Sequence, residues 1–285
     1  MFTFLSVFFA LSAAALYGVS SVLQQSAAQK EKELPIVGLK IVRRLIRRPF
    51  WLFALSLSGL SFIVQAIALK FGPLALVQPI AATDLLFALP LLAYRHRYHI
   101  NLREWLACAM VVGGITGFLV ISPPSSGLEQ PSLAAWTLVF VCTGITVTIA
   151  TIRSFGTSGT QRTMLLAGAG SLLFAVVDAL TKGLVDLTSK QGVAALTSWE
   201  PYVLLVAGIC GIVFAQAAYR SGSLVTSLPI IDTVEPIAAV FIGATVFNEK
   251  LGGSLLLWST QIISASIAVL GIVLLSRAPY LSTTS

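Results

Sequence analysis

Charged residues are scarce in this chain of 285 residues, making up 10% of the sequence, whereas a soluble domain carries roughly 25%. Hydrophobic residues make up 56%, and the mean hydropathy is +0.91. A chain of this composition cannot cover itself with an ordinary polar surface. The scarcity of charge therefore excludes a soluble protein and predicts an all-α polytopic membrane protein.

Cysteine and histidine are also rare. Cys108, Cys142 and Cys210 all fall inside predicted membrane spans and are odd in number, so we expect no disulfide framework and no metal role for them. Both histidines lie in the basic segment RHRYH, with no cysteine or acidic partner nearby. The sequence therefore predicts no bound metal and no cofactor.

The sequence lacks the motifs of intramembrane enzymes and of ATP-driven pumps. It contains no H-E-x-x-H, no G-x-S-x-G and no histidine in a predicted span, so we predict that it is not an enzyme. It also contains no G-x-x-x-x-G-K-[ST] loop, which excludes ATP-driven transport by this chain alone.

Long apolar runs dominate what remains. About 20 helical residues cross a hydrocarbon core of ~30 Å, and nine runs reach this length. The first run lacks a cationic start and is too long for a signal peptide, so we expect a retained helix. The predicted spans are residues 2–26, 50–70, 73–94, 104–122, 132–152, 163–187, 200–220, 223–247 and 254–276.

Basic residues are unevenly shared between the two sides of such a bundle. Assigning the loops alternately places 14 of the 18 Lys and Arg residues on one side and 4 on the other. Positive loops stay in the cytoplasm, so we predict a plasma-membrane protein with its N-terminus outside and its C-terminus inside. Because the net charge of +7 comes from these loops, it does not indicate a nucleic-acid partner.

The chain contains an internal repeat. KFGPLALVQPI (Lys70–Ile80) recurs 150 residues later as RSGSLVTSLPI (Arg220–Ile230). An odd number of spans separates the copies, so the sequence predicts an inverted repeat of helices 1–4 and 6–9, with helix 5 linking them. The corresponding divisions are residues 1–125, with a basic interfacial loop at 29–49, residues 126–160 and residues 161–285.

Two other segments indicate contacts with partners. From Leu39 onward the first loop alternates apolar and basic residues at helical spacing, which is typical of a segment lying on membrane lipids. It is interpreted either as a topology anchor or as a lipid sensor or gate. Gly113 and Gly117 form a G-x-x-x-G spacing, which fits a homodimer contact or close packing within one chain.

Four of the 11 acidic residues lie far from the predicted helix ends: Asp84, Asp178, Asp232 and Glu235. Intramembrane acids are costly and mark ion or substrate sites. Asp84 and Glu235 follow Pro79 and Pro229 at nearly the same depth of the two repeats, so we expect them to contact the substrate or the coupling ion. Asp232 lies one turn before Glu235, and repulsion between them should keep a proton on one. All three could instead only tie helices together.

Further polar residues are candidates for lining a cavity. Asp178 stands four residues before Lys182, so an internal ion pair competes with a substrate contact there. The uncharged candidates are Tyr17, Ser21 and Gln24 in the first helix, Gln65 in the second and Gln216 in the seventh.

The stretch TVEPIAAVFIGATVFNEKL (Thr233–Leu251) resembles the end of an EamA-type repeat, with Pro and small residues, then Gly and Glu-x-Leu. Together with the duplication, the chain resembles the drug/metabolite transporter superfamily, and QPIAATDLLFALPL is loosely similar to the NIPA-like magnesium-transporter branch. The first copy, LLFALPLLAYRHRY, lacks Glu-x-Leu, and nine spans stand where the family has ten.

This resemblance, with the buried acids, implies a secondary-active transporter of a small molecule or ion that works by alternating access and is coupled to protons. Three alternatives remain at this point. They are a divalent-cation carrier, a flippase for a lipid or lipid-linked sugar, and a membrane scaffold without transport activity.

Overall fold

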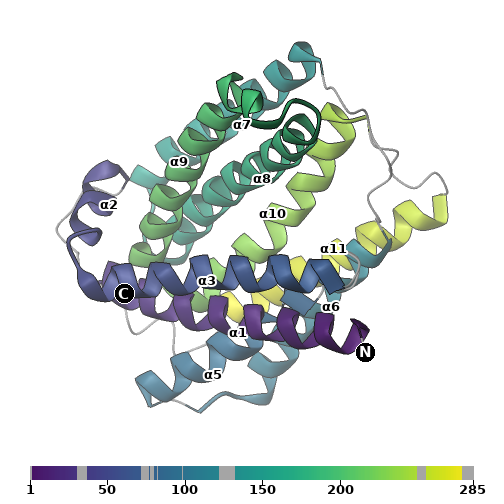
Figure 1. The fold of residues 1–285 in the computed structure, drawn as a ribbon. Coiled ribbons are helices and arrows are strands. Elements are labelled where there is room, and N and C mark those ends of the chain that lie inside the picture. The colour runs from purple at the N-terminus through teal and green to yellow at the C-terminus, as the bar shows by residue number, and fades with distance from the viewer. Residues whose placement is uncertain are drawn as a thin grey trace.

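The computed structural model describes residues 2–30, 37–71, 77, 80–81, 83–97, 99–121, 132–248 and 255–277. Within these ranges the chain is helical and contains no strand (Figure 1). The helices are α1 (Phe2–Ala28), α2 (Leu39–Leu45), α3 (Pro49–Phe71), α5 (Asp84–His96), α6 (Leu102–Ile121), α7 (Leu133–Phe155), α8 (Gly159–Gln191), the 3₁₀ helix η1 (Gly192–Thr197), α9 (Glu200–Ser221), α10 (Leu224–Val246) and α11 (Leu255–Ser276).

Seven of these helices are long and apolar enough to cross a membrane: α1, α3, α7, α8, α9, α10 and α11. The protein is therefore a multi-pass membrane protein, as the composition predicts. Helix α5 has 13 residues, too few to span a bilayer by itself. Neither α5 nor α6, which cover the third and fourth predicted spans, is among the seven, so the count of nine stays a prediction.

The predicted third span, residues 73–94, is wrong as a single helix. Helix α5 begins at Asp84, after a turn at Thr83. The Thr83 hydroxyl donates to the carbonyl of Ile80, and Asp84 Oδ1 accepts a hydrogen bond from the N–H of Leu85. Short polar side chains thus bind backbone groups that a continuous helix would pair internally. Asp84 lies at a helix start rather than a helix middle, and Pro79 lies outside the described residues.

The helix contacts follow the order that the predicted repeat would give. Helix α1 packs on α3 and α5, while α8 packs on α9 and α10. Helix α6 packs on α11, which is its own counterpart under the 150-residue offset. Figure 1 shows two groups of helices, with α1 beside α3 in one and α8 beside α9 in the other. By their contacts, α5 belongs to the group of α1 and α10 to the group of α8. These pairings are what a repeat of four helices would produce, and the inverted relation of the copies remains a prediction.

Small residues let α6 and α11 approach closely. A Cβ added at Gly114 would lie 2.6 Å from the backbone nitrogen of Ala268, and one at Gly117 would lie 2.8 Å from Ser264 Oγ. At Gly113 an added Cβ would meet nothing within 4 Å. Gly117 therefore serves packing inside one chain. Whether Gly113 serves a homodimer contact stays a prediction.

We expect Gly114→Ala to destabilise the protein, because its methyl group has to push α11 away; overpacking of this kind costs about 1–3 kcal/mol. Gly113→Ala is the matched control one residue away, and it should leave stability unchanged or raise it slightly, since Ala favours helix. Thermal unfolding of the two purified variants in the same detergent checks this difference. Equal melting temperatures would show that the α6–α11 contact is looser than described.

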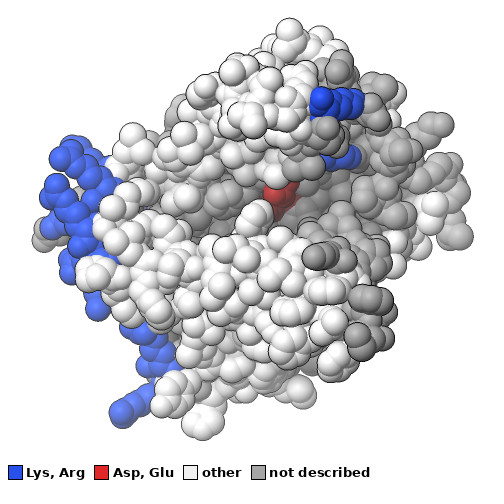
Figure 2. All heavy atoms as spheres, viewed as in Figure 1, with Lys and Arg blue, Asp and Glu red and all other residues white. Residues whose placement is uncertain are grey.

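Lys and Arg residues gather at one end of the helices. Figure 2 shows them along the left edge, where Figure 1 places α2 and the starting end of α3. Lys40, Arg43, Arg44, Arg47 and Arg48 are exposed there. This uneven distribution is the pattern that positive-inside topology requires.

The topology prediction concerns the side of the membrane on which each loop lies. A tag inserted at residue 35 and one at the C-terminus should both be protected in intact cells, while a tag at residue 126 should be accessible. Accessibility to an impermeant reagent, before and after permeabilisation, measures this. Finding residue 35 outside would overturn both the span count and the orientation.

A candidate coupling and substrate site between α5, α8 and α10

The acidic site has a pair of aspartates from different parts of the chain at its centre. Asp84 starts α5 and is 1% exposed, while Asp232 is half-buried in α10. Their carboxyl groups lie within hydrogen-bonding reach of each other. Oδ2 of each is buried and receives no hydrogen bond from the N–H and O–H groups that the structure describes. Two carboxylates can share such a contact only when a proton or another cation lies between them.

Glu235 extends the acidic site along α10. It is half-buried in the middle of that helix, one turn beyond Asp232, as the sequence predicts. Its carboxylate lies within electrostatic range of Asp84 and of Asp178, which comes from α8. Asp84, Asp178 and Glu235 therefore come together from three helices, although they are far apart in the sequence.

Asp178 occupies the open side of this group. Its side chain is exposed, whereas that of Asp84 is fully buried. Figure 2 shows acidic atoms in the hollowed middle of one face, between the two groups of helices. Lys182, one turn further along α8, places its Nζ 4.7 Å from the centre of the Phe247 ring. An ion pair between Asp178 and Lys182 stays a prediction.

Two prolines inside α10 change the backbone beside the acids. Pro229 and Pro236 have no N–H, so the helix cannot pair the carbonyl groups four residues earlier in the usual way. For Pro236 that carbonyl belongs to Asp232. A backbone oxygen without its helical donor thus lies at the same residue as one of the paired carboxylates, which adds an acceptor for a cation or for water.

Helix α1 places polar groups next to the acids. A Cβ added at Gly18 would lie 2.5 Å from the carbonyl oxygen of Asp84, so α1 touches the start of α5. The hydroxyl groups of Tyr17 and of Tyr219 on α9 lie within electrostatic range of Asp84, Asp232 and Glu235. Ser21 is 1% exposed, and its Oγ makes no hydrogen bond of normal geometry with the described groups, although Tyr219 is close to it.

A network of buried amides joins α1, α3 and α9. Gln216 Nε2 donates to Gln24 Oε1 at 2.6 Å, and Trp51 Nε1 donates to Gln216 Oε1 at 3.2 Å. Gln24 Nε2 in turn donates to the hydroxyls of Ser20 and Ser58, both at 2.9 Å. Gln24, Trp51 and Gln216 are each less than a tenth exposed. This amide network joins the last turns of α1 and α9 to the first turn of α3.

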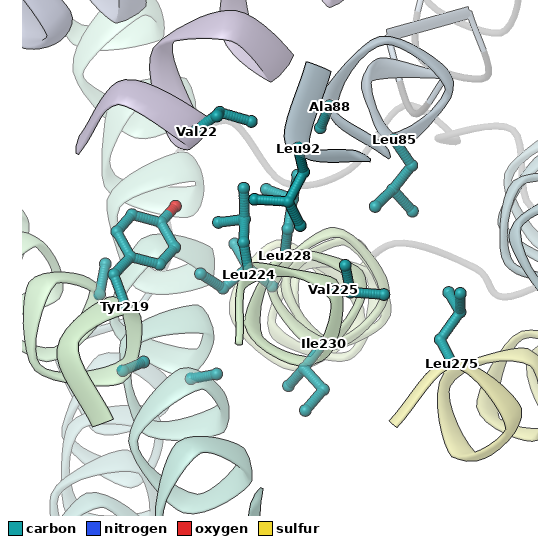
Figure 3. Packing of buried hydrophobic residues seen from close by; sticks show 14 of the residues in the cluster. Val22, Leu85, Ala88, Leu92, Tyr219, Leu224, Val225, Leu228, Ile230 and Leu275 are labelled. Atoms are coloured by element: carbon teal, nitrogen blue, oxygen red, sulfur yellow. The ribbon is translucent and has the colours of Figure 1, made fainter. Parts of the chain in front are cut away.

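The amide network lies at the basic end of the molecule. Trp51 follows shortly after the basic segment of α2, and Gln25 Nε2 donates to the carbonyl of Gly222, where α9 turns into α10, at 2.9 Å. Leu92 of α5 also packs toward α10 at this end, and Figure 3 shows it against Leu224 and Leu228, whereas Leu85 lies nearer to Val225. At this end the two groups of helices are closed on each other by apolar and polar contacts.

The structure thus separates the predicted polar residues into two sets and leaves one residue outside both. Asp84, Asp232, Glu235 and Asp178 form the acidic site, with Tyr17 and Ser21 beside it. Gln24 and Gln216 belong to the amide network. Gln65 is half-buried on α3 and belongs to neither set, and the described residues include no hydrogen-bond partner for it. Trp51 and Tyr219 were missed, because an aromatic residue in an apolar run gives no sign of a buried polar role.

Comparison with known proteins finds a relative that matches along nearly the whole chain. An uncharacterized protein of Corynebacterium glutamicum is 27% identical to it over 276 residues, covering 96% of this chain and 95% of that protein. No family model and no solved structure matches the chain.

Proposed function

We propose that this multi-pass membrane protein is a secondary-active transporter of a small molecule, coupled to protons and working by alternating access. The observation that carries the proposal is the meeting of Asp84, Asp178, Asp232 and Glu235 from three helices at a hollow between two helix groups. Carboxylates held inside a membrane protein are expensive, and they mark ion and proton pathways. The resemblance to the drug/metabolite transporter superfamily points to the same class.

The unequal ends of the hollow support alternating access. At the basic end α1, α3 and α9 are joined by the amide network, and α5 packs on α10 (Figure 3). At the same end, the side-chain amides of Gln25 and Gln29 both donate to the carbonyl of Gly222, just after α9. Within the described residues, Asp178 is exposed while the basic end is closed, which fits a carrier that is open on one side only. With the predicted topology, the closed side is the cytoplasmic one.

A proton is the coupling ion that these residues suit best. The Asp84–Asp232 contact needs a shared cation, and the smallest cation fits two carboxyl groups at hydrogen-bonding distance. A divalent-cation carrier receives less support, because no group of three His, Cys, Asp or Glu side chains in the described ranges could hold a metal ion. The flippase alternative stays a second candidate, because a hollow between helices could admit a lipid headgroup.

The test begins with substrate identification. Purified protein is screened by thermal shift against small-molecule classes, divalent cations and lipid-linked sugars, and each ligand that stabilises it is then tested in proteoliposomes. We expect uptake of one class to rise when the lumen and the medium differ in pH and to stop when a protonophore removes the gradient. An uptake rate that changes neither with the pH gradient nor with the protonophore would overturn proton coupling.

A further inference from the structure

Helix α2 has three different faces, which is more than a simple connector needs. Leu45 is fully buried against the bundle, and Val42 packs beside it. On a helix of 3.6 residues per turn, Leu39 and Ile46 are seven positions apart and share a second face. That face is apolar but open, with Leu39 66% exposed and Ile46 50% exposed.

The third face of α2 is basic. Lys40 and Arg43 are three positions apart and lie on one side of the helix, and Arg47 follows in the turn after α2; all three are exposed. Arg44 and Arg48 are exposed next to them. No acidic residue lies between Lys40 and Arg48 in the sequence. This basic face borders the open apolar face that contains Leu39 and Ile46.

The connectivity of α2 fixes its depth relative to the membrane. Helices α1 and α3, which precede and follow it, are both long enough to cross the bilayer, so α2 lies where their ends meet the interface. It is also a folded part of the protein, because it packs against α9 and α1. An open apolar stripe beside a basic face at this depth matches the acyl chains and anionic headgroups of a lipid leaflet.

We propose that α2 is a binding surface for anionic phospholipid, with Lys40, Arg43 and Arg47 on the headgroup and Leu39 and Ile46 against the first carbons of the acyl chains. The surface acts in the folded protein, beyond any role that the basic loop has in setting topology during insertion. The proposal does not depend on transport, because it concerns a face of the molecule that lies apart from the acidic site.

The experiment uses the full chain purified in a neutral detergent and titrated with short-chain phosphatidylglycerol or phosphatidylcholine. Thermal unfolding is followed at low salt. We expect phosphatidylglycerol to raise the melting temperature at concentrations where phosphatidylcholine does not, and 0.5 M NaCl to weaken the effect. Inorganic phosphate should not substitute, since it has no acyl chain for the apolar face. Equal effects of the two lipids would overturn the proposal.

Variants assign the effect to α2. The triple variant Lys40→Gln, Arg43→Gln, Arg47→Gln should need at least tenfold more phosphatidylglycerol for half of the shift, because each basic residue near an anionic surface contributes about fivefold in affinity. The matched control is Arg95→Gln, Arg97→Gln, Arg103→Gln, which removes the same charge from exposed positions outside α2. An unchanged titration in the α2 variant, or an equal loss in the control, would contradict the assignment.

Two further variants guard against misfolding of the triple variant. Arg43→Lys with Arg47→Lys keeps the charge and should keep the preference for phosphatidylglycerol. Leu39→Asn with Ile46→Asn keeps every basic residue but removes the apolar face, so it should weaken binding of the lipid. Wild-type binding in this second variant would show that α2 acts as a charged surface only, which would overturn the role of the apolar face.

Discussion

Replacing Glu235 by Gln is expected to abolish gradient-driven uptake while the protein stays folded. Gln has nearly the same volume as Glu and can still form hydrogen bonds, so the packing of α10 should survive and only the titratable group is lost. Glu235 is half-buried and lies within electrostatic range of both Asp84, in the buried aspartate pair, and Asp178, which is exposed. We expect coupled uptake in proteoliposomes to fall at least a hundredfold.

Two comparisons make this result specific. Glu200→Gln also removes a partly buried carboxylate, but at the first residue of α9 and outside the acidic site, so it should keep uptake close to the parent rate. Substrate exchange without a pH gradient should persist in Glu235→Gln if Glu235 carries the proton and not the substrate. Full gradient-driven uptake in both Glu235→Gln and Asp84→Asn would reduce these acids to contacts that hold helices together.

Replacing Gln216 by Leu is expected to open the basic end of the protein. Gln216 is buried, accepts a hydrogen bond from Trp51 Nε1 and donates one to Gln24 Oε1. Leu can make neither bond, so both groups lose this partner. An orphaned buried polar group costs about 1–3 kcal/mol, so the state in which water reaches these groups becomes more populated. The population of the state open at the basic end should rise roughly ten- to a hundredfold.

The readout is the chemical accessibility of a single cysteine near the amide network. Cys108, Cys142 and Cys210 are replaced by Ser, and Ala218→Cys supplies a thiol at a fully buried position of α9. A charged maleimide added on the side of the basic end, which the predicted topology makes cytoplasmic, should modify it much faster in the Gln216→Leu variant. Gln65→Leu removes a half-buried amide outside the network and should leave the rate unchanged. Equal rates in all three proteins would show that the network does not hold this end closed.

The sequence predicts the class of this protein and most of its helices, because spanning a bilayer demands long apolar runs that are visible without a structure. It also predicts the acids, since an intramembrane carboxylate stands out against such a background. It cannot show that α5 begins at Asp84, because the apolar pattern continues through a turn that short polar side chains stabilise. Nor can it show that Gln24 meets Gln216, since a partner 192 residues away leaves no local pattern.

The length of helix α8 has a consequence for imaging the protein. Its 33 residues make a rod of about 50 Å, whereas the hydrocarbon core of a bilayer is only ~30 Å thick. Even a strongly tilted α8 has to extend into water at one end. The C-terminal end of α8 continues into η1 (Gly192–Thr197), where Val193 is 81% exposed. An antibody fragment raised against this protruding end would bind α8 beyond the bilayer and provide a rigid marker for imaging.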